Sequence, residues 1–355
     1  MRIYKHRPNL VFDSPGVCDN DLKQLFGGKE FYELSSGKAC IVHALKLWNI
    51  KQKNILVPYY ICHDVIYAIK STGNSIIFCD IDVMDLNISY ESVVSICKNV
   101  EISAVVAPSL YGNSANIAEL SDFCKRKKIK LLNDCAQACG ATLNKKSLLE
   151  YGDASFMSIS TGKPLFGFSG AYMSIMEGNL RLAKASNLYY LLSASSYLFG
   201  RVLIEWRVFR VVGKLFSKMS KIWINNSNLS IYNLSVPSWV SWYNRKIISA
   251  QLNLKFQYRQ EFIDDIVNTK NYRVIRHVRG DPVGFRLILL FFEKEIHKKF
   301  SDYLTTNHIY HSNGYDIYSF QFYSAHKINK RIMDIPIDCN EEKRKYLKKI
   351  LDGYS

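Results

Sequence analysis

Apolar and polar stretches alternate along the first half of the chain in a way that predicts a three-layer α/β domain. Short apolar runs rich in Val, Ile and Leu are typical of strands buried on both faces of a parallel sheet. These runs occupy residues 54–58, 75–80, 102–107 and 130–134, and two further strands are expected at residues 154–158 and 170–175. Apolar side chains recur at helical spacing over residues 64–72 and 117–128, between the runs, and over residues 41–48, before the first run. The alternation of strand and helix predicts helices on both faces of the sheet.

The pattern changes near residue 180, where a basic and apolar stretch of helical character begins. This stretch reaches residue 223 and is followed by a polar loop that ends at residue 237. The elements expected beyond it are a helical region, a strand, a charged helix and a closing helix, at residues 239–267, 284–292, 294–304 and 341–351. We therefore expect a large α/β domain over residues 1–239, with an insertion at residues 180–237, and a smaller α+β domain over residues 240–355.

The composition is that of a globular protein with a basic surface. With 48% hydrophobic and 22% charged residues among 355, the chain is unlike disordered, collagen-like or coiled-coil proteins. Its formal net charge of +16 favours an anionic partner, such as a phosphorylated substrate, a nucleic acid or a membrane surface. The basic residues are spread out and form no known nucleic-acid-binding motif, so we expect no nucleic-acid partner.

The sequence also predicts where the protein works. The basic start of the chain is not followed by an apolar run, so no signal peptide is expected. The longest uncharged apolar stretch, residues 186–200, is shorter than the ~20 residues that cross a bilayer. The nine cysteines are an odd number and contain no Cys-x-x-Cys pair. We therefore expect a cytoplasmic protein with reduced cysteines and no bound metal.

A first candidate binding segment is the start of the helix expected near residue 41, where the sequence is Ser-Ser-Gly-Lys-Ala-Cys from residue 35 to residue 40. Small residues at a helix start present backbone N–H groups and the positive end of the helix dipole, which suits a phosphate. The candidate binding groups are Gly37, Lys38 and Ala39. The alternative is an ordinary serine N-cap, which is the favoured interpretation of this segment taken alone.

A second candidate is Asp134, which ends the expected strand at residues 130–134. The carboxyl end of a buried parallel strand faces the crevice where α/β proteins bind ligands. The alternative is that Asp134 only caps the turn that follows. Gln137, three residues later, either faces the same crevice or is a polar turn residue.

A third candidate is Lys163, which lies among small, hydroxylic and apolar residues between two expected strands. Such surroundings can lower the pKa of an amine and make it a nucleophile toward an aldehyde. The alternative is a solvated loop lysine.

A fourth segment, around Tyr60, Cys62 and His63, joins a strand to a helix beside the crevice. A side chain there could cover a flat ring, or simply pack in the core.

The order and spacing of these segments resemble the DegT/DnrJ/StrS family of pyridoxal-phosphate (PLP) sugar aminotransferases, from about residue 31 to the C-terminus. The family has the aspartate-aminotransferase type of fold, PLP fold type I. Its Ser-Gly-Thr-Ala helix start is similar to residues 36–39, and its Glu-Asp-x-Ala-Gln/His-x-x-Gly-Ala segment resembles residues 133–141. Its strand-Pro-x-x-x-aromatic segment, its Gly-Asp with a later Ser and Lys, and its Leu-Pro-Ile/Val strand resemble residues 57–62, 152–163 and 333–337.

The resemblance implies a role for each candidate residue. Lys163 would hold the cofactor as a Schiff base and move a proton, and Asp134 would pair with the pyridine N–H. The phosphate would be held by Ser158 and by the amides of Gly37, Lys38 and Ala39. Gln137 would approach the hydroxyl of the cofactor ring. Cys62 would cover the face of that ring. Three features depart from the family pattern: Lys38 replaces a threonine, Cys62 replaces an aromatic residue, and Phe168-Ser169 interrupts a glycine-rich stretch. The family's phosphate-binding asparagine from the partner subunit has no assigned position among Asn225, Asn226 and Asn228.

The implied function is transamination in sugar or surface-glycan biosynthesis. A cytoplasmic homodimer would take the amino group from an amino acid, glutamate being the expected donor, and transfer it to a keto-sugar, which we expect to be nucleotide-linked. A sugar dehydratase of the same fold that lacks the Schiff-base lysine is disfavoured because Lys163 is present. A degenerate, non-catalytic or regulatory family member is the alternative.

The basic stretch at residues 180–223 raises the question whether this part of the chain contacts a membrane, which can be tested separately. Leu198, Val202, Trp206 and Phe209 recur at steps of three and four residues, and arginines and lysines surround them, which suits a helix on an anionic membrane surface. The favoured alternative is a helix that packs in a dimer contact or over the core. A membrane-surface helix predicts co-sedimentation with anionic liposomes that weakens as salt rises, because exposed charges are screened beyond ~8 Å at physiological salt. A packed helix predicts no co-sedimentation even at low salt.

Overall fold

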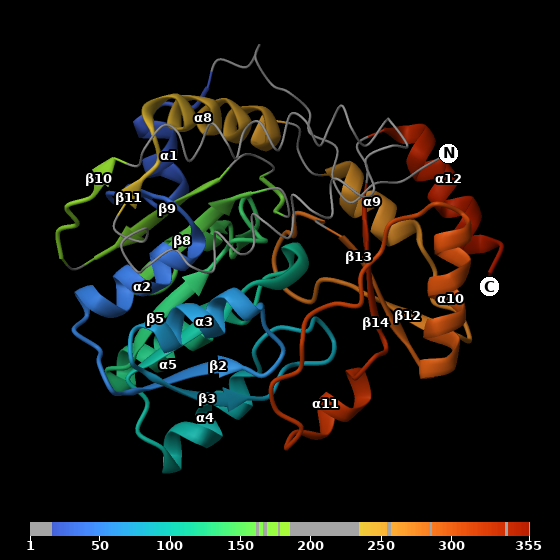
Figure 1. The fold of residues 1–355 in the computed structure, drawn as a ribbon, viewed down its shortest axis with the longest axis horizontal. Coiled ribbons are helices and arrows are strands. Elements are labelled where there is room, and N and C mark those ends of the chain that lie inside the picture. The colour runs from blue at the N-terminus through green and yellow to red at the C-terminus, as the bar shows by residue number, and fades with distance from the viewer. Residues whose placement is uncertain are drawn as a thin grey trace, which may run out of the picture.

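The computed structural model describes most of the chain, and Figure 1 shows its two bodies, each built around a β-sheet. The described residues are 16–160, 163–165, 169–176, 178–184, 234–253, 257–284, 286–337 and 340–354. Most of the insertion expected at residues 180–237 therefore lies outside the described residues, as do Phe168 and the three candidate asparagines. In the part that is described, no helix is both long and apolar enough to pass through a lipid bilayer.

The large body is built on a seven-stranded sheet in the order β1-β9-β8-β5-β4-β2-β3. Its strands are β1 (Tyr32–Leu34), β2 (Asn54–Pro58), β3 (Ser75–Cys79), β4 (Ala104–Pro108), β5 (Lys130–Asp134), β8 (Ala154–Ile159) and β9 (Gly170–Ile175). Strands β3, β2, β4, β5 and β8 run parallel to one another, as predicted for the apolar runs at β2 to β5. In contrast, β9 is antiparallel to β8 and β1 is antiparallel to β9. The connection from β8 to β9 is too short for a parallel crossover, which needs about a dozen residues or more.

Helices cover both faces of this sheet and make the three expected layers (Figure 1). They are α1 (Asp19–Leu25), α2 (Gly37–Leu47), α3 (His63–Ser71), α4 (Tyr90–Asn99) and α5 (Ile117–Lys127). Alternate side chains of the strands point to opposite faces. Leu56 of β2 therefore joins the core beneath α1, α4 and α5, whereas its neighbours Ile55 and Val57 join the core beneath α2 and α3.

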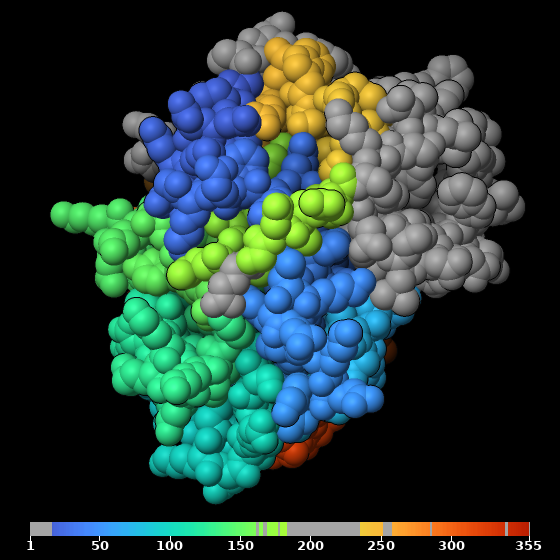
Figure 2. All heavy atoms as spheres, turned by 90° about the vertical axis from the view of Figure 1, so that its left-hand side faces the viewer, coloured from blue at the N-terminus to red at the C-terminus, as the bar shows by residue number. Residues whose placement is uncertain are grey.

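The remaining short elements connect these layers. They are the 3-10 helices at Leu110–Gly112 and Leu148–Glu150, the hairpin strands β6 (Thr142–Leu143) and β7 (Lys146–Ser147), and the parallel pair β10 (Ala183–Lys184) and β11 (Leu234–Ser235). Helix α8 (Ser238–Asn253) follows β11 and lies against the N-terminal segment, as Figure 2 shows in gold and dark blue. Its Ile248 joins the core of the large body, and Arg245 forms an ion pair with Asp19 at 2.6 Å. The division between residues 239 and 240 stays a prediction.

The small body packs four helices against a three-stranded antiparallel sheet in the order β12-β13-β14. Its elements are α9 (Gln257–Asp265), β12 (Tyr272–Ile275), β13 (Arg286–Phe291), α10 (Lys294–Thr306), α11 (Tyr323–Ile328), β14 (Ile332–Pro336) and α12 (Glu341–Asp352). All six residues of the central strand β13 are buried. Arg286, at its start, forms a buried ion pair with Asp334 of β14.

Tyrosines and one carboxylate join the two bodies. Tyr59 and Tyr60 follow β2 and share an apolar cluster with Ile328 of α11. The Tyr59 hydroxyl lies 2.7 Å from the hydroxyl of Ser324. In the loop after β3, Asp85 is fully buried and accepts a hydrogen bond at 3.0 Å from Arg279 of the small body. Burial raises the pKa of Asp85 to about 6.

The buried carboxyl of Asp85 predicts a dependence of stability on pH. Its folded-state pKa lies above the unfolded value, so the folded protein binds more protons between about pH 4 and pH 6. The contribution of Asp85 to the free energy of unfolding should therefore fall as pH rises through this window, by roughly 3 kcal/mol. Asp85→Asn keeps an acceptor for the Asn87 amide and removes the charge.

Urea unfolding of both proteins at several pH values measures this difference. We expect the Asp85→Asn variant to lose part of the fall in stability between pH 4 and pH 6, and to match the parent protein in stability at neutral pH. The comparable variant Asp122→Asn, on the exposed side of α5, should leave the pH profile unchanged. A pH profile identical in the parent and in Asp85→Asn would contradict the assignment.

Candidate active site

Two neighbouring strands bring Lys163 and Asp134 to the same edge of the sheet. Asp134 ends β5, and Lys163 lies in the turn that follows β8, the strand paired with β5. The turn is held by two backbone hydrogen bonds: Lys163 N–H to Ser160 O at 3.3 Å, and Ser160 N–H to Leu165 O at 3.2 Å. Lys163 is half-buried there. Because the strands are parallel, their carboxyl ends meet at the crevice expected for ligands.

Asp134 is buried, with 8% of its surface exposed. Burial raises the pKa of its carboxyl, and the positive charge of Lys163 lowers it. The structure thus places the Lys163 charge close enough to act on Asp134. Oδ1 accepts a hydrogen bond from the Ala136 N–H at 2.9 Å, as the turn-capping interpretation expects. Oδ2 has no hydrogen-bond partner among the described residues, so the carboxylate retains an acceptor for a ligand.

The start of α2 lies beside the end of β8. Ser36 is the N-cap, and its Oγ accepts a hydrogen bond from the Ala39 N–H at 3.3 Å, so the capping interpretation is confirmed. A Cβ at Gly37 would lie 3.5 Å from Oγ of Ser158, which shows how closely the helix start approaches this strand. The helix dipole, the first turn and a serine hydroxyl therefore meet at one place, an arrangement that suits a phosphate.

Lys38 directs its ammonium group away from this meeting point. Its Nζ lies 3.2 Å from a carboxylate oxygen of Asp64 and 6.0 Å from the centre of the Tyr67 ring, both on α3. The ammonium group therefore links α2 to α3. This contact gives a structural reason for a lysine where the family has threonine.

Cys62 lies near Lys163, as its predicted position over a cofactor requires. Burial raises the pKa of the Cys62 thiol, and the positive charge of Lys163 lowers it. Tyr60, an alternative ring-covering residue, is fully engaged elsewhere. Its hydroxyl lies 2.6 Å from the Tyr111 hydroxyl and accepts a hydrogen bond from the Tyr315 N–H at 3.1 Å. His63 is exposed and lines a different cleft.

Gln137 links the large body to a tyrosine that sequence analysis did not find. Its Oε1 accepts a hydrogen bond from the Tyr111 N–H at 2.8 Å, and its Nε2 donates to the Tyr315 hydroxyl. Tyr315 stacks on Tyr111 with ring centres 5.8 Å apart. Burial and the neighbouring Cys62 raise the pKa of Tyr315, so its hydroxyl keeps its proton. No local pattern identifies Tyr315, because it follows Gln137 by 178 residues in an irregular segment.

Residues 19–182 match the model of the DegT/DnrJ/EryC1/StrS aminotransferase family. The family resemblance is confirmed. The chain is 28% identical to the GDP-perosamine synthase of Vibrio cholerae over 156 residues, which are 44% of this chain and 42% of that protein. The chain matches less than half the length of each of the three curated relatives found first.

Solved structures of the family extend the likeness to the fold of both bodies. Helicobacter pylori PseC, an aminotransferase involved in pseudaminic-acid biosynthesis, has a TM-score of 0.70 at 14% identity and covers 100% of this chain and 99% of its own. The Escherichia coli GDP-4-keto-6-deoxy-D-mannose-3-dehydratase with bound hydrated PLP has a TM-score of 0.67 at 15% identity, covering 94% of this chain and 90% of its own. The chain has the PLP fold type I, as expected.

The structure brings the predicted site residues into two neighbouring groups, whose roles stay predictions. In the first group, the positive charge of Lys163 lowers the pKa values of Asp134 and Cys62. In the second group, Gly37 lies against Ser158. Ser169, one of the departures from the family pattern, donates a hydrogen bond from its Oγ to the Ser35 carbonyl at 2.9 Å. This contact ties the segment after the lysine to the start of α2. Gln137 lies in contact with Tyr315 and not within either group.

Proposed function

We propose that this protein is a PLP-dependent aminotransferase that moves an amino group from glutamate to a nucleotide-linked keto-sugar. The observation that carries the proposal is the placement of Lys163 and Asp134 at neighbouring strand ends, with a phosphate-compatible helix start beside them. The proposal is supported by the family to which residues 19–182 are matched and by the name of the Vibrio relative, a GDP-perosamine synthase.

The described residues fit the cofactor. Asp134 offers an unpaired carboxylate oxygen to a ring N–H. Ser158 offers a hydroxyl whose contact to the Gly170 carbonyl is long, at 3.4 Å, and Gly37 at the start of α2 lies close beside it. When bound, PLP supplies an aldehyde carbon that condenses with amines and a ring that withdraws electrons. Lys163 is the amine that the motif places at this edge.

The chain's own residues then have distinct tasks. Lys163 Nζ acts first as a nucleophile and then takes and returns a proton at the substrate carbon. Asp134 holds a negative charge in a buried setting, where it stabilises an adjacent cation far more than it would in water. Cys62 and the neighbouring tyrosines exclude water from this edge. Ser158 and the Gly37, Lys38 and Ala39 segment orient the phosphate end.

The E. coli structure with PLP is a sugar dehydratase, which makes dehydration the second reaction to consider. Lys163 argues for transamination because a lysine can both condense with the aldehyde and carry the proton. A regulatory member without catalysis is the other alternative. The proposal disfavours it because Lys163 and Asp134 are both present and adjacent.

We further propose that the enzyme works in the cytoplasm as a homodimer. The eight cysteines among the described residues are all free, which supports a reducing compartment. Relatives of the chain are named as enzymes of GDP-linked sugars, and a basic surface suits the diphosphate of such a substrate. Contact of residues 180–223 with a membrane stays a prediction.

Replacing Lys163 tests the proposal directly. Lys163→Ala should lower the transamination rate by about 10³-fold or more, because the variant lacks both nucleophile and proton carrier. It should also lose the absorbance band of the lysine-bound cofactor. The melting temperature of the cofactor-free variant should stay that of the cofactor-free parent, because the side chain is half-exposed in a turn. Lys51→Ala, at an exposed loop position before β2, is the matched control. Transamination that persists in Lys163→Ala would refute the assignment.

Replacing Asp134 tests whether catalysis needs the negative charge of its carboxylate. Asp134→Asn keeps an acceptor for the Ala136 N–H but removes the negative charge. We expect the variant to retain part of its affinity for PLP and to lose about 10²-fold or more in turnover, because a neutral amide stabilises no cation beside it. Steady-state kinetics together with a PLP titration separate the two effects. An unchanged kcat would mean that Asp134 only caps its turn.

A further inference from the structure

The side chain of Gln137 is fixed by one hydrogen bond from each body. Its Oε1 accepts from the Tyr111 N–H of the large body at 2.8 Å, and its Nε2 donates to the Tyr315 hydroxyl of the small body. Because a backbone N–H can only donate, the amide atom that meets Tyr111 must be the oxygen. The nitrogen of the amide therefore faces Tyr315.

One donor of the Gln137 amide is left over. Nε2 carries two hydrogens, and among the described residues only the Tyr315 hydroxyl accepts one of them. Gln137 is 5% exposed. A buried N–H without an acceptor is costly, so this hydrogen is available to an oxygen of a bound ligand.

The leftover donor lies close to the edge that carries Asp134 and Lys163. Gln137 follows Asp134 by three residues in the turn after β5. Cys62 connects Tyr315 to the same edge: the charge of Lys163 lowers the pKa of the Cys62 thiol, and Cys62 in turn raises the pKa of Tyr315. Gln137 and Tyr315 thus stand beside the residues proposed to bind the cofactor.

Tyr111 adopts an unusual backbone conformation where it meets Gln137. Its φ of 58° and ψ of 17° lie in the left-handed region, which bulky residues rarely occupy. Its ring stacks on that of Tyr315 with centres 5.8 Å apart, and its hydroxyl lies 2.6 Å from the Tyr60 hydroxyl. Backbone, ring and hydroxyl contacts therefore hold the residue that fixes the amide oxygen.

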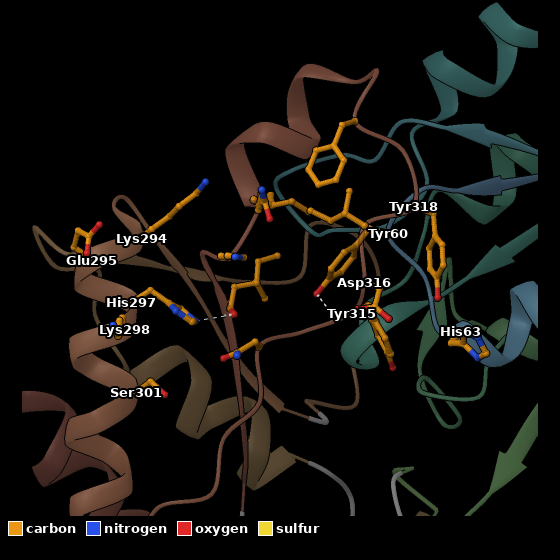
Figure 3. A pocket seen from close by; sticks show the side chains of 17 residues that line it. Tyr60, His63, Lys294, Glu295, His297, Lys298, Ser301, Tyr315, Asp316 and Tyr318 are labelled. Carbon is orange, nitrogen blue, oxygen red and sulfur yellow. Dashed lines mark hydrogen bonds between the residues drawn. The ribbon is translucent and has the colours of Figure 1, made fainter. Parts of the chain in front are cut away.

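Tyr315 is placed by hydrogen bonds at the border of a cleft. Its N–H donates to the Tyr60 hydroxyl at 3.1 Å, as the dashed line in Figure 3 shows. The preceding Gly314 has a φ of +74°, and a Cβ there would overlap the Tyr60 hydroxyl. Tyr60 and Tyr315 line a cleft of about 880 Å³ beside α10, together with His297 and Lys298. Because this cleft borders Tyr315, its place depends on these contacts and not on packing from every side.

We propose that Tyr315 is a positioning residue that acts through Gln137 and holds the free N–H of that amide toward an oxygen of the bound cofactor. The inference rests on the proposed function, in which PLP occupies this edge. A fixed donor stabilises negative charge on the ring oxygen that it meets, which tightens binding and favours the ionised ring hydroxyl. The small body thus contributes to cofactor binding through a residue of the large body.

Titration of the cofactor-free protein with PLP, followed by absorbance, tests the proposal. Tyr315→Phe keeps the ring but releases Nε2, and should raise the dissociation constant of PLP about fivefold, the usual effect of one neutral hydrogen bond. Gln137→Glu keeps an acceptor for the Tyr111 N–H but removes the donor, so it should bind PLP at least as weakly. Because glutamate leaves no donor for Tyr315 to position, the double variant should bind PLP as Gln137→Glu does.

The absorbance of the bound cofactor gives a second measurement. Both single variants should move the pH midpoint of its absorbance change upward, since loss of the donor disfavours the ionised ring oxygen. Tyr346→Phe is the matched control, because it removes another tyrosine hydroxyl of the small body, one that donates to the Asn307 carbonyl at 3.2 Å. This variant should keep the PLP affinity and the pH midpoint of the parent.

The outcomes separate this inference from the proposed reaction. The fivefold loss of affinity should recur when Tyr315→Phe is added to Lys163→Ala, where PLP binds without a covalent link and no transamination occurs. Unchanged PLP affinity in Tyr315→Phe would overturn the inference, as would a double variant that binds PLP more weakly than Gln137→Glu. A parent protein that binds PLP but transfers no amino group would instead refute the proposed transamination and leave this inference standing.

Discussion

A carboxylate buried at the end of a central strand is costly unless a positive charge stands near it, and Asp134 meets this condition through Lys163. The parallel order of β5 and β8 makes the meeting possible, because it places both carboxyl ends at one edge. Buried apolar residues of the strands surround that edge, and the start of α2 lies close to the end of β8. The proposed chemistry depends on the pairing of the buried Asp134 carboxylate with the positive charge of Lys163.

The tyrosines that join the two bodies give the small body a part in the site. Tyr315 is held from the large body by Gln137 and Tyr60, and it stands near Cys62 and the Arg286–Asp334 pair. Tyr60 and Tyr315 also line the cleft beside α10. The hydroxyls of both residues have hydrogen-bond partners, which hold these rings where the two bodies meet.

Much of the fold follows from local patterns. The apolar runs at β2 and β5 and the helical spacing at α5 were sufficient to predict these elements, because burial on both faces of a sheet requires continuous apolar strands. The short strand β1 and the helix α4 were not predicted. Three residues are too few for a pattern, and α4 buries little of its apolar surface. The direction of β9 depended on the length of a connection, not on its residues.

The sequence by itself determined the resemblance to the family, the order of most elements and the candidates Lys163, Asp134, Ser158 and Gly37, because these depend on residue type and spacing along the chain. Only the tertiary structure decided which of them meet. It joined Lys38 to Asp64, committed Tyr60 to internal hydrogen bonds and brought Tyr315 to Gln137 across 178 residues. Such contacts depend on how separate elements pack in space, and nothing in the local sequence encodes the distance between them.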